Sequence, residues 1–168
     1  MKHLIALTIF SSFVAMANAQ APANSANTYP NKPVKVVVGF APGGAADYVA
    51  RTLSDPMGKA LGQPIIVENK AGAGSSIAAE AVSKAAPDGY TILIASPSSI
   101  SVNPALNPKL GYAPKDLMPV TKITTSPLVI AANPNAGIGS LTELVAKAKK
   151  APGTINYATS GNGSAPHL

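Results

Sequence analysis

Glycine and serine gather in four short stretches of this sequence, and their chemistry suits the binding of a small anion. The stretches are GFAPGG (39–44), NKAGAGSS (69–76), ASPSSIS (95–101) and TSGNGS (159–164). Exposed backbone N–H groups, hydroxyls and the positive end of a helix dipole hold an anion without a basic side chain. A single Gly-rich turn is well explained as a tight connection. Four such turns together predict a ligand cleft, provided that the fold brings them together.

The elements around these stretches alternate between two periodicities. Apolar runs of strand length occupy 34–40, 64–69 and 90–96. Between them, 45–61 has helical apolar spacing and 75–86 is an Ala-rich helix that begins with serine. This order predicts an α/β fold with a parallel sheet covered by helices on both faces. With a further strand expected at 154–160, all four Gly/Ser stretches follow the carboxyl ends of predicted parallel strands, where open α/β sheets bind ligands.

The second half of the chain is less regular. Residues 97–118 carry four prolines, and two short extended segments are expected at 118–123 and 127–132. A helix is predicted at 141–151, with Ser140 and Glu143 spaced for a capping box. A further strand is predicted at 154–160. The Gly-rich turn after that strand should lead into another helix, so we interpret the 168 residues as a fragment.

The N-terminus predicts export. Lys2 and His3 precede an apolar run that ends in Ala17-Asn18-Ala19, the pattern of a signal peptide cleaved after Ala19. A membrane anchor is the alternative, but the apolar run falls short of the roughly 20 residues that a spanning helix needs. Residues 20–33 are small, polar and proline-containing, and are interpreted as a leader before the fold. The expected location is the periplasm.

Several functional classes fit poorly. The turn after the first strand reads G-x-x-x-G-G and not G-x-G-x-x-G, and no P-loop is present, so no nucleotide cofactor is expected. The chain has no cysteine and two histidines, one of them in the signal segment, so no catalytic residue and no metal site is expected. The net charge of +6 comes from scattered lysines, which does not favour nucleic acid as a partner.

Four motifs, in this order and spacing, closely resemble the Bug/TctC family of periplasmic solute-binding proteins of tripartite tricarboxylate transporters. They are PGGxxD, VENxxGAG, APDGYT and SGNGSxxHL, and the similarity runs from about Tyr29 to Leu168. The resemblance implies a type II periplasmic-binding-protein fold, in which a ligand cleft lies between two α/β lobes. It divides the chain into a signal peptide (1–19), a leader (20–33), an incomplete first lobe (34–122), and a hinge with the start of a second lobe (123–168).

By the same resemblance, the GFAPGG and SGNGS loops face each other across the cleft and hold a carboxylate through backbone N–H groups and hydroxyls. Ala41 departs from the family, where a second proline is common. Asp47 either faces the ligand or pairs with Arg51 one helical turn later. The candidate ligand contacts are Phe40, Ala41, Gly43, Gly44, Asp47, Ser96, Ser98, Ser99, Ser160, Asn162, Gly163 and Ser164.

The resemblance also suggests the partners. A monomeric receptor that delivers a small carboxylate to a membrane permease is the leading interpretation, and an enzyme is not expected. The alternative is a periplasmic sensor or orphan binding protein that reports its ligand state to a signalling partner. Both functions need the same cleft.

Overall fold

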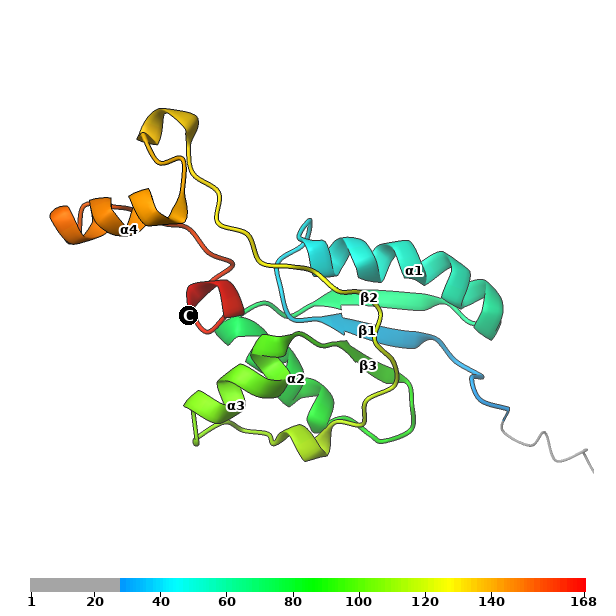
Figure 1. Ribbon diagram of the computed structural model, residues 1–168. Coiled ribbons are helices and arrows are strands. Elements are labelled where there is room, and N and C mark those ends of the chain that lie inside the picture. Colours follow the sequence, from blue (N-terminus) through cyan, green and yellow to red (C-terminus); the bar gives the residue numbers. More distant parts are fainter. Residues whose placement is uncertain (1–27) are drawn as a thin grey trace, which may run out of the picture.

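A computed structural model describes residues 28–168 of the chain (Figure 1). The predicted signal peptide and residues 20–27 of the predicted leader lie outside the described residues. The centre of the structure is a three-stranded parallel sheet in the order β2-β1-β3, formed by Val34–Val38 (β1), Ile65–Asn69 (β2) and Thr91–Ile94 (β3). In register, Val36 of β1 pairs with Val67 on one side and with Ile92 on the other. The predicted parallel sheet is confirmed.

Helices cover both faces of this sheet. Helix α1 (Ala45–Leu61) lies on one face and α2 (Ser76–Ser83) on the other (Figure 1). Helix α1 ends at Gly62, whose left-handed conformation (φ 67°) suits glycine. Parallel strands joined by helices form right-handed βαβ crossovers. The pattern of apolar runs therefore predicted the layers of helix and sheet.

The core is small and is centred on β1, between the sheet and α1. Val36 and Val38 are almost fully buried and pack with Ala50 of α1. Partly buried side chains from α1 and all three strands complete this cluster: Ala46, Ile65, Val67, Ile92 and Ile94. Alanine at the helix contact lets α1 approach the sheet closely, which fixes the position of the loop that precedes the helix.

Short helical turns follow two of the strands. The 3₁₀ turn η1 (Ala73–Ser75) leads into α2, and a π-helical turn η2 (Ser98–Val102) leads into α3 (Asn103–Leu106). π-helical turns are rare and are found frequently at functional sites. Further 3₁₀ turns are η3 (Pro114–Asp116), η4 (Pro134–Ala136) and η5 (Ala165–His167).

Helix α4 (Leu141–Lys150) begins as predicted at Ser140, whose Oγ accepts a hydrogen bond from the N–H of Glu143 (3.2 Å). The return bond differs slightly from a standard capping box. The Glu143 carboxylate accepts from the N–H of Gly139 (2.7 Å), one residue before the N-cap. The helix contributes no buried residue to a core.

The predicted strand at 154–160 was wrong, because the structure has no regular element there. A strand needs a neighbouring strand for its backbone hydrogen bonds, and none of the described residues supplies one. Tyr157 in this segment is 72% exposed. The segments 118–123 and 127–132 also lack regular structure, and this part of the chain runs across the molecule towards α4 (Figure 1).

Contacts of the fold begin at Tyr29, inside the segment 20–33 that we expected to precede it. The Tyr29 hydroxyl donates to the carbonyl of Gly89 (2.8 Å), and its ring meets that of Tyr90 edge-on at 4.9 Å. Lys32 forms an ion pair with Asp88 at 3.2 Å. These contacts secure the chain to the turn before β3. Among the described helices, none combines the length and the apolar character needed to cross a membrane.

Candidate functional site

The turns after the three strands meet at the carboxyl edge of the sheet, as the topology predicts. The clearest contact is between Gly39, which ends β1, and Ser75, which follows β2. A Cβ atom built on Gly39 would lie 1.8 Å from the Ser75 Oγ. No side chain fits at Gly39, so glycine there is what lets the second turn close against the first.

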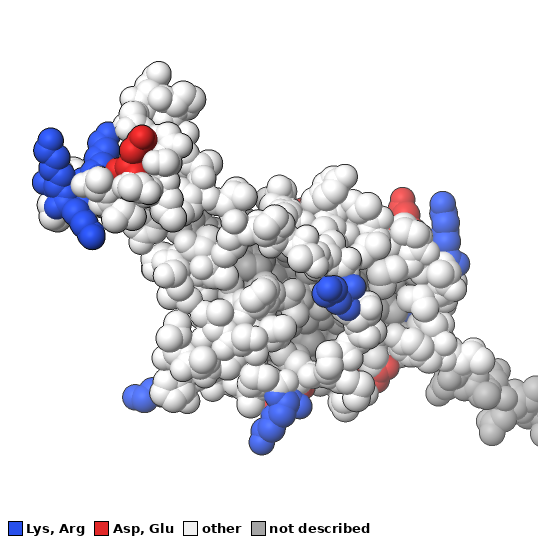
Figure 2. All heavy atoms as spheres, viewed as in Figure 1, with Lys and Arg blue, Asp and Glu red and all other residues white. Residues whose placement is uncertain are grey.

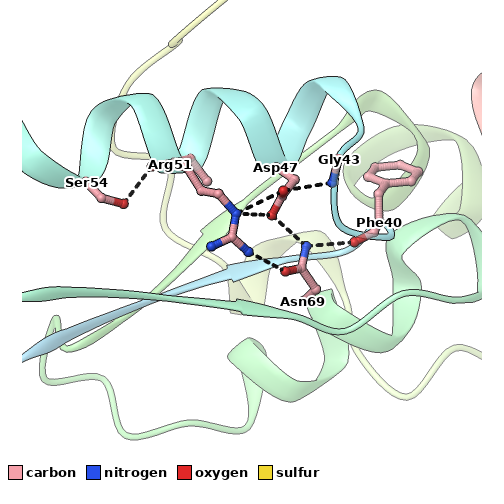
Figure 3. A network of polar contacts seen from close by, with 7 residues as sticks. Phe40, Gly43, Asp47, Arg51, Ser54 and Asn69 are labelled. Atoms are coloured by element: carbon pink, nitrogen blue, oxygen red, sulfur yellow. Dashed lines mark hydrogen bonds and ion pairs between the residues drawn. The ribbon is translucent and has the colours of Figure 1, made fainter.

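A buried carboxylate organises the turn before α1 (Figure 3). Asp47 is 3% exposed, and its Oδ2 accepts from the N–H of Gly43 at 2.9 Å. Arg51 Nε lies 3.0 Å from each carboxylate oxygen. Asn69, at the end of β2, donates through Nδ2 to Asp47 Oδ1 at 2.9 Å and to the carbonyl of Phe40 at 3.0 Å. The turn is therefore held at both ends, at Phe40 and at Gly43.

This network determines the charge state of Asp47. Hydrogen bonds from the Arg51 guanidinium, the Gly43 N–H and the Asn69 amide hold the pKa of Asp47 well below its ordinary value. Both carboxylate oxygens are in use. Of the two interpretations of Asp47 that the sequence left open, the geometry supports pairing with Arg51 and support of the turn; direct contact with a ligand stays a prediction.

The outer side of the same turn has room for a ligand. A Cβ atom at Gly43 would meet nothing within 4 Å, and one at Gly44 would meet only the Ala41 carbonyl at 3.6 Å. Gly43 has a φ of +85°, whereas Gly44 is in the ordinary extended region. The N-cap residue Gly44 offers no side-chain hydrogen bond to the first N–H groups of α1.

The turn after β2 has an unusual backbone. Three consecutive residues are left-handed: Ala73 (φ 46°), Gly74 (φ 59°) and Ser75 (φ 74°). For a non-glycine residue this conformation costs roughly 1–2 kcal/mol. Such conformations persist where the surroundings hold them, and they concentrate at functional sites. The turn places the hydroxyl of Ser75 in the interior, where the residue is fully buried.

The turn after β3 uses its serines in two ways. Ser99 is buried, and its Oγ donates to the Ser96 carbonyl (3.1 Å) and accepts from the Ser96 N–H (3.3 Å), which closes the turn. Tyr112 donates to the Ser99 carbonyl at 2.5 Å. Ser98 instead contacts a distant part of the chain, because its Oγ accepts a hydrogen bond from the N–H of Ala165 at 2.8 Å.

The SGNGS segment (160–164) lies against the turn after β2. A Cβ atom on Gly74 would lie 2.0 Å from the Gly163 carbonyl oxygen, so the two backbones touch directly. Between them is a cavity of about 260 Å³, lined by Ala73, Ser76, Asn103, Asn107, Leu110, Asn162 and Gly163. Ser164 is fully buried. Within residues 28–168, the hydroxyls of Ser75 and Ser164 are the buried side-chain groups that lack a hydrogen-bond partner.

Charge is nearly absent from these loops. Lys70 is the one charged residue in the four Gly/Ser stretches. It forms an ion pair with Glu68, with a distance of 2.6 Å between Nζ and Oε1. Lys70 and Lys35 together lower the pKa of Glu68 to about 2. Figure 2 shows basic side chains gathered over α4, where Lys147, Lys149 and Lys150 lie, and elsewhere isolated on this face. Residues 28–168 contain no cluster of three or more His, Cys, Asp or Glu side chains suited to a metal ion.

A larger hollow of about 440 Å³ lies at the opposite end of the sheet, between the end of α1 and the start of β2. Its lining includes Asp55, Lys59 and Ile65. None of the four Gly/Ser stretches lines this hollow. We therefore place the candidate site at the carboxyl edge of the sheet.

The predicted contact residues fall into three groups that the structure brings together. Phe40, Gly43 and Asp47 share one network, and Ser96, Ser98 and Ser99 form the turn after β3. Gly163 lies against Gly74 of the turn after β2, and the residue that follows Ser164 donates a hydrogen bond to Ser98. Ala41, Gly44, Ser160 and Asn162 lie on the exposed sides of their loops. Whether each of these residues contacts a ligand stays a prediction.

Sequence reasoning missed Ser75, Ser76 and Asn103. For the serines, the signal was available, since they end the glycine-rich stretch 69–76. Asn103 gave no local signal, because its contacts are with residues 27–30 positions earlier.

Comparison with known proteins identifies the family of this chain. Residues 49–168 match the tripartite tricarboxylate transporter family receptor, TctC. The chain is 41% identical to protein BugT of Bordetella pertussis over 164 residues, which is 96% of this chain and 50% of BugT. It is also 41% identical to a second B. pertussis protein, of the UPF0065 group, over 143 residues, covering 85% of this chain and 44% of that protein. The chain thus spans about half the length of the curated relatives it matches.

Solved structures of similar proteins share the fold of this chain. MatC from Rhodopseudomonas palustris with bound malate superposes with a TM-score of 0.76 and 39% identity, over 82% of this chain and 47% of MatC. R. palustris Rpa4515 with adipate superposes with a TM-score of 0.64 and 28% identity, over 81% and 46%. These neighbours confirm the predicted α/β fold of the periplasmic binding proteins. Sequence motifs, sheet topology and structural neighbours all agree, and the chain belongs to the TctC (Bug) family of solute-binding receptors.

Proposed function

We propose that this protein is a periplasmic receptor that binds a small carboxylated solute at the carboxyl edge of the sheet. The observation that carries the proposal is the convergence of four Gly/Ser loops around buried hydroxyls, with Lys70 the only charged residue in those loops and already paired with Glu68. Such loops offer N–H groups and hydroxyls to an anion, and these donors select a carboxylate by hydrogen-bond geometry.

Two details of the geometry support a ligand at this edge. Buried polar groups are almost always hydrogen-bonded, and the hydroxyls of Ser75 and Ser164 have no partner among the described residues. The turn at Gly43 and Gly44 has open space on its outer side and presents the N-terminus of α1 there. A carboxylate is small enough for this turn and is favoured by the helix dipole.

The relatives support the ligand class. MatC is described with bound malate, and Rpa4515 with adipate. Both ligands are dicarboxylates, and both proteins share the fold of this chain. We propose a ligand of the same class, with non-enzymatic binding as the activity.

Calorimetry on the complete natural protein tests the ligand class. The panel holds malate, adipate, citrate and a monocarboxylate, with ATP and NAD as controls. We expect at least one carboxylate to bind with a dissociation constant in the micromolar range or below, and neither nucleotide to bind. Tight nucleotide binding with no response to any carboxylate would overturn the proposal.

We further propose uptake as the role, with export by cleavage after Ala19 and a membrane permease of the tripartite tricarboxylate type as the partner. N-terminal sequencing of the periplasmic fraction tests the cleavage site. Deletion of the gene should abolish uptake of the radiolabelled ligand identified by calorimetry. Normal uptake together with loss of a transcriptional response to that ligand would favour a sensory role instead.

A further inference from the structure

Asn103 lies behind the loops of the candidate site and contacts several of them. It is the first residue of α3 and only 8% exposed. Its Nδ2 donates to Ser76 Oγ at 2.9 Å, and lies 3.2 Å from the carbonyl of Ala73 and 3.3 Å from that of Gly74. The two amide protons of one side chain are therefore shared among three acceptors of the turn after β2.

Two of these acceptors, the carbonyls of Ala73 and Gly74, belong to the left-handed turn Ala73–Ser75, and the third, Ser76 Oγ, follows it. The Ala73 carbonyl also accepts a hydrogen bond from the backbone N–H of Ser76. Asn103 supplies donors to two successive carbonyls of the turn and to the first hydroxyl of α2. It is the side chain that the structure places to hold this turn.

The opposite edge of the Asn103 amide borders the SGNGS segment. A Cβ atom on Gly163 would lie 3.0 Å from Asn103 Oδ1, and one on Gly74 would lie 2.8 Å from its Nδ2. The amide thus lies beside the contact between Gly74 and Gly163. Its backbone N–H donates to the carbonyl of Ser98, the residue whose hydroxyl binds the N–H of Ala165. One residue connects the turn after β2, the turn after β3 and the SGNGS segment.

We propose that Asn103 is a positioning residue for ligand binding, which holds the left-handed turn Ala73–Ser75 against the segment 160–164 in the arrangement that accepts the ligand. The proposal rests on the proposed carboxylate-binding function. Asn103 acts through Ser75, Ser76 and Gly163. Its amide is needed as a donor, because all three of its partners in the turn after β2 are oxygen acceptors.

Asn103→Asp tests the donor requirement. The substituted carboxylate keeps the shape of the side chain but presents lone pairs to the carbonyls of Ala73 and Gly74, which repel it. When protonated, the same group donates one hydrogen bond again, and burial raises the pKa of such a carboxyl. Tyr112 reaches the same network through Ser76 Oγ at 3.5 Å. Each variant is compared with the wild type at the same pH, so a difference that depends on pH reports the new carboxyl.

The matched control is Asn133→Asp. Asn133 is exposed, precedes η4 and does not line the cavity. Its Oδ1 accepts from the N–H of Asn135 at 2.8 Å, a bond that aspartate keeps. The control adds the same charge by the same substitution away from the candidate site. Asn103→Ser is a second test variant: it adds no charge, and its short hydroxyl cannot reach both carbonyls.

The experiment measures malate affinity by calorimetry between pH 5 and 8 for the complete wild-type protein and the three variants, each folded by circular dichroism. The dissociation constant of Asn103→Asp should be at least about tenfold higher than that of the wild type at pH 8. The ratio of the two constants should fall towards one as the pH decreases. Asn103→Ser should lose affinity at every pH, and the affinity of Asn133→Asp should stay within about twofold of wild type. Wild-type affinity in both Asn103 variants would overturn the proposal.

A second measurement does not depend on the ligand. Amide hydrogen exchange in Asn103→Asp and Asn103→Ser should accelerate in both 73–76 and 160–164, with no change in these segments in Asn133→Asp. Unchanged exchange in these segments would overturn the positioning role even where malate fails to bind. Failure of the wild-type protein to bind any carboxylate would instead refute the proposed function, so the two results are distinguishable.

Discussion

The backbone N–H of Ala165 donates a hydrogen bond of 2.8 Å to the hydroxyl of Ser98, a residue 67 positions earlier in the chain. Ser98 is 2% exposed, so the bond is shielded from water. It joins the SGNGS segment to the turn after β3 and completes the convergence of loops at the carboxyl edge. The candidate site therefore depends on contacts between distant parts of the sequence.

Ser98→Ala tests this link. The substitution leaves the partly buried N–H of Ala165 without this acceptor, and we expect a loss of about 0.5–1.5 kcal/mol in the free energy of unfolding. Chemical denaturation measures the loss. Ser83→Ala is the control, since the Ser83 hydroxyl bonds only to the Glu80 carbonyl in its own helix. If amide exchange at Ala165 in Ser98→Ala matches that in the control, the bond does not hold the segment.

Gly44→Ala tests whether the ligand approaches the turn before α1. Gly44 has an ordinary φ of −79° and free space for a Cβ atom, so the folded structure should accept alanine. A ligand in contact with the backbone there would be displaced, and the affinity should fall at least about tenfold, or roughly 1.4 kcal/mol. Gly43→Val is a poorer probe, because the φ of +85° makes any side chain strained.

Gly139→Ala is the control for Gly44→Ala. It lies one residue before the N-cap of α4, and a Cβ atom there would have the Glu143 carboxylate as its nearest neighbour at 3.3 Å. Melting temperatures of both variants should stay close to that of the wild type. Full ligand affinity in folded Gly44→Ala would remove this turn from the site.

Acid should destabilise the protein through Asp47 and Glu68. Both carboxyls have a folded-state pKa below the ordinary value, with Glu68 at about 2. Each therefore contributes stability that is fully present above its ordinary pKa of 3.8 or 4.5 and is lost as the pH falls through the folded value. The free energy of unfolding should decrease steadily from pH 5 to pH 2.

Asp47→Asn should flatten that decrease, because it removes one of the carboxyls whose pKa is lowered in the folded state, and it should lower the stability at pH 7. Asp55→Asn, on the exposed side of the same helix, should change neither quantity. Urea denaturation at several pH values gives both results. An identical pH slope in Asp47→Asn and wild type would show that the Asp47–Arg51–Asn69 network does not stabilise the fold.

Residues 28–168 expressed alone should self-associate. Large apolar side chains are exposed along the segment 118–130: Met118 (88%), Val120 (83%), Leu128 (67%), Val129 (82%) and Ile130 (74%). Exposed apolar patches of this kind favour association. Sedimentation velocity should show assembly that grows with concentration, and Val129→Ser with Ile130→Ser should reduce it. A monomer at high concentration would contradict this expectation.

Much of the architecture followed from the sequence. The apolar runs of β1, β2 and β3 and the helical spacing of 45–61 predicted the parallel sheet, because periodicity is a local property and the handedness of βαβ units leaves little choice of topology. The same rule predicted that the turns at 39–44, 69–76 and 95–101 meet at one edge. These predictions did not need the side-chain contacts.

Tertiary structure decided the rest. The segment 154–160 has the composition of a strand but forms none, because strand formation depends on a neighbour that local sequence cannot supply. The role of Asp47 depended on Asn69, 22 residues later, which supplies a donor to its carboxylate. Asn103 holds a left-handed turn 27–30 residues before it, a relationship without any local pattern. Local periodicity determines which elements form and in what order, whereas the partner of each buried polar group is chosen by the packing of distant segments.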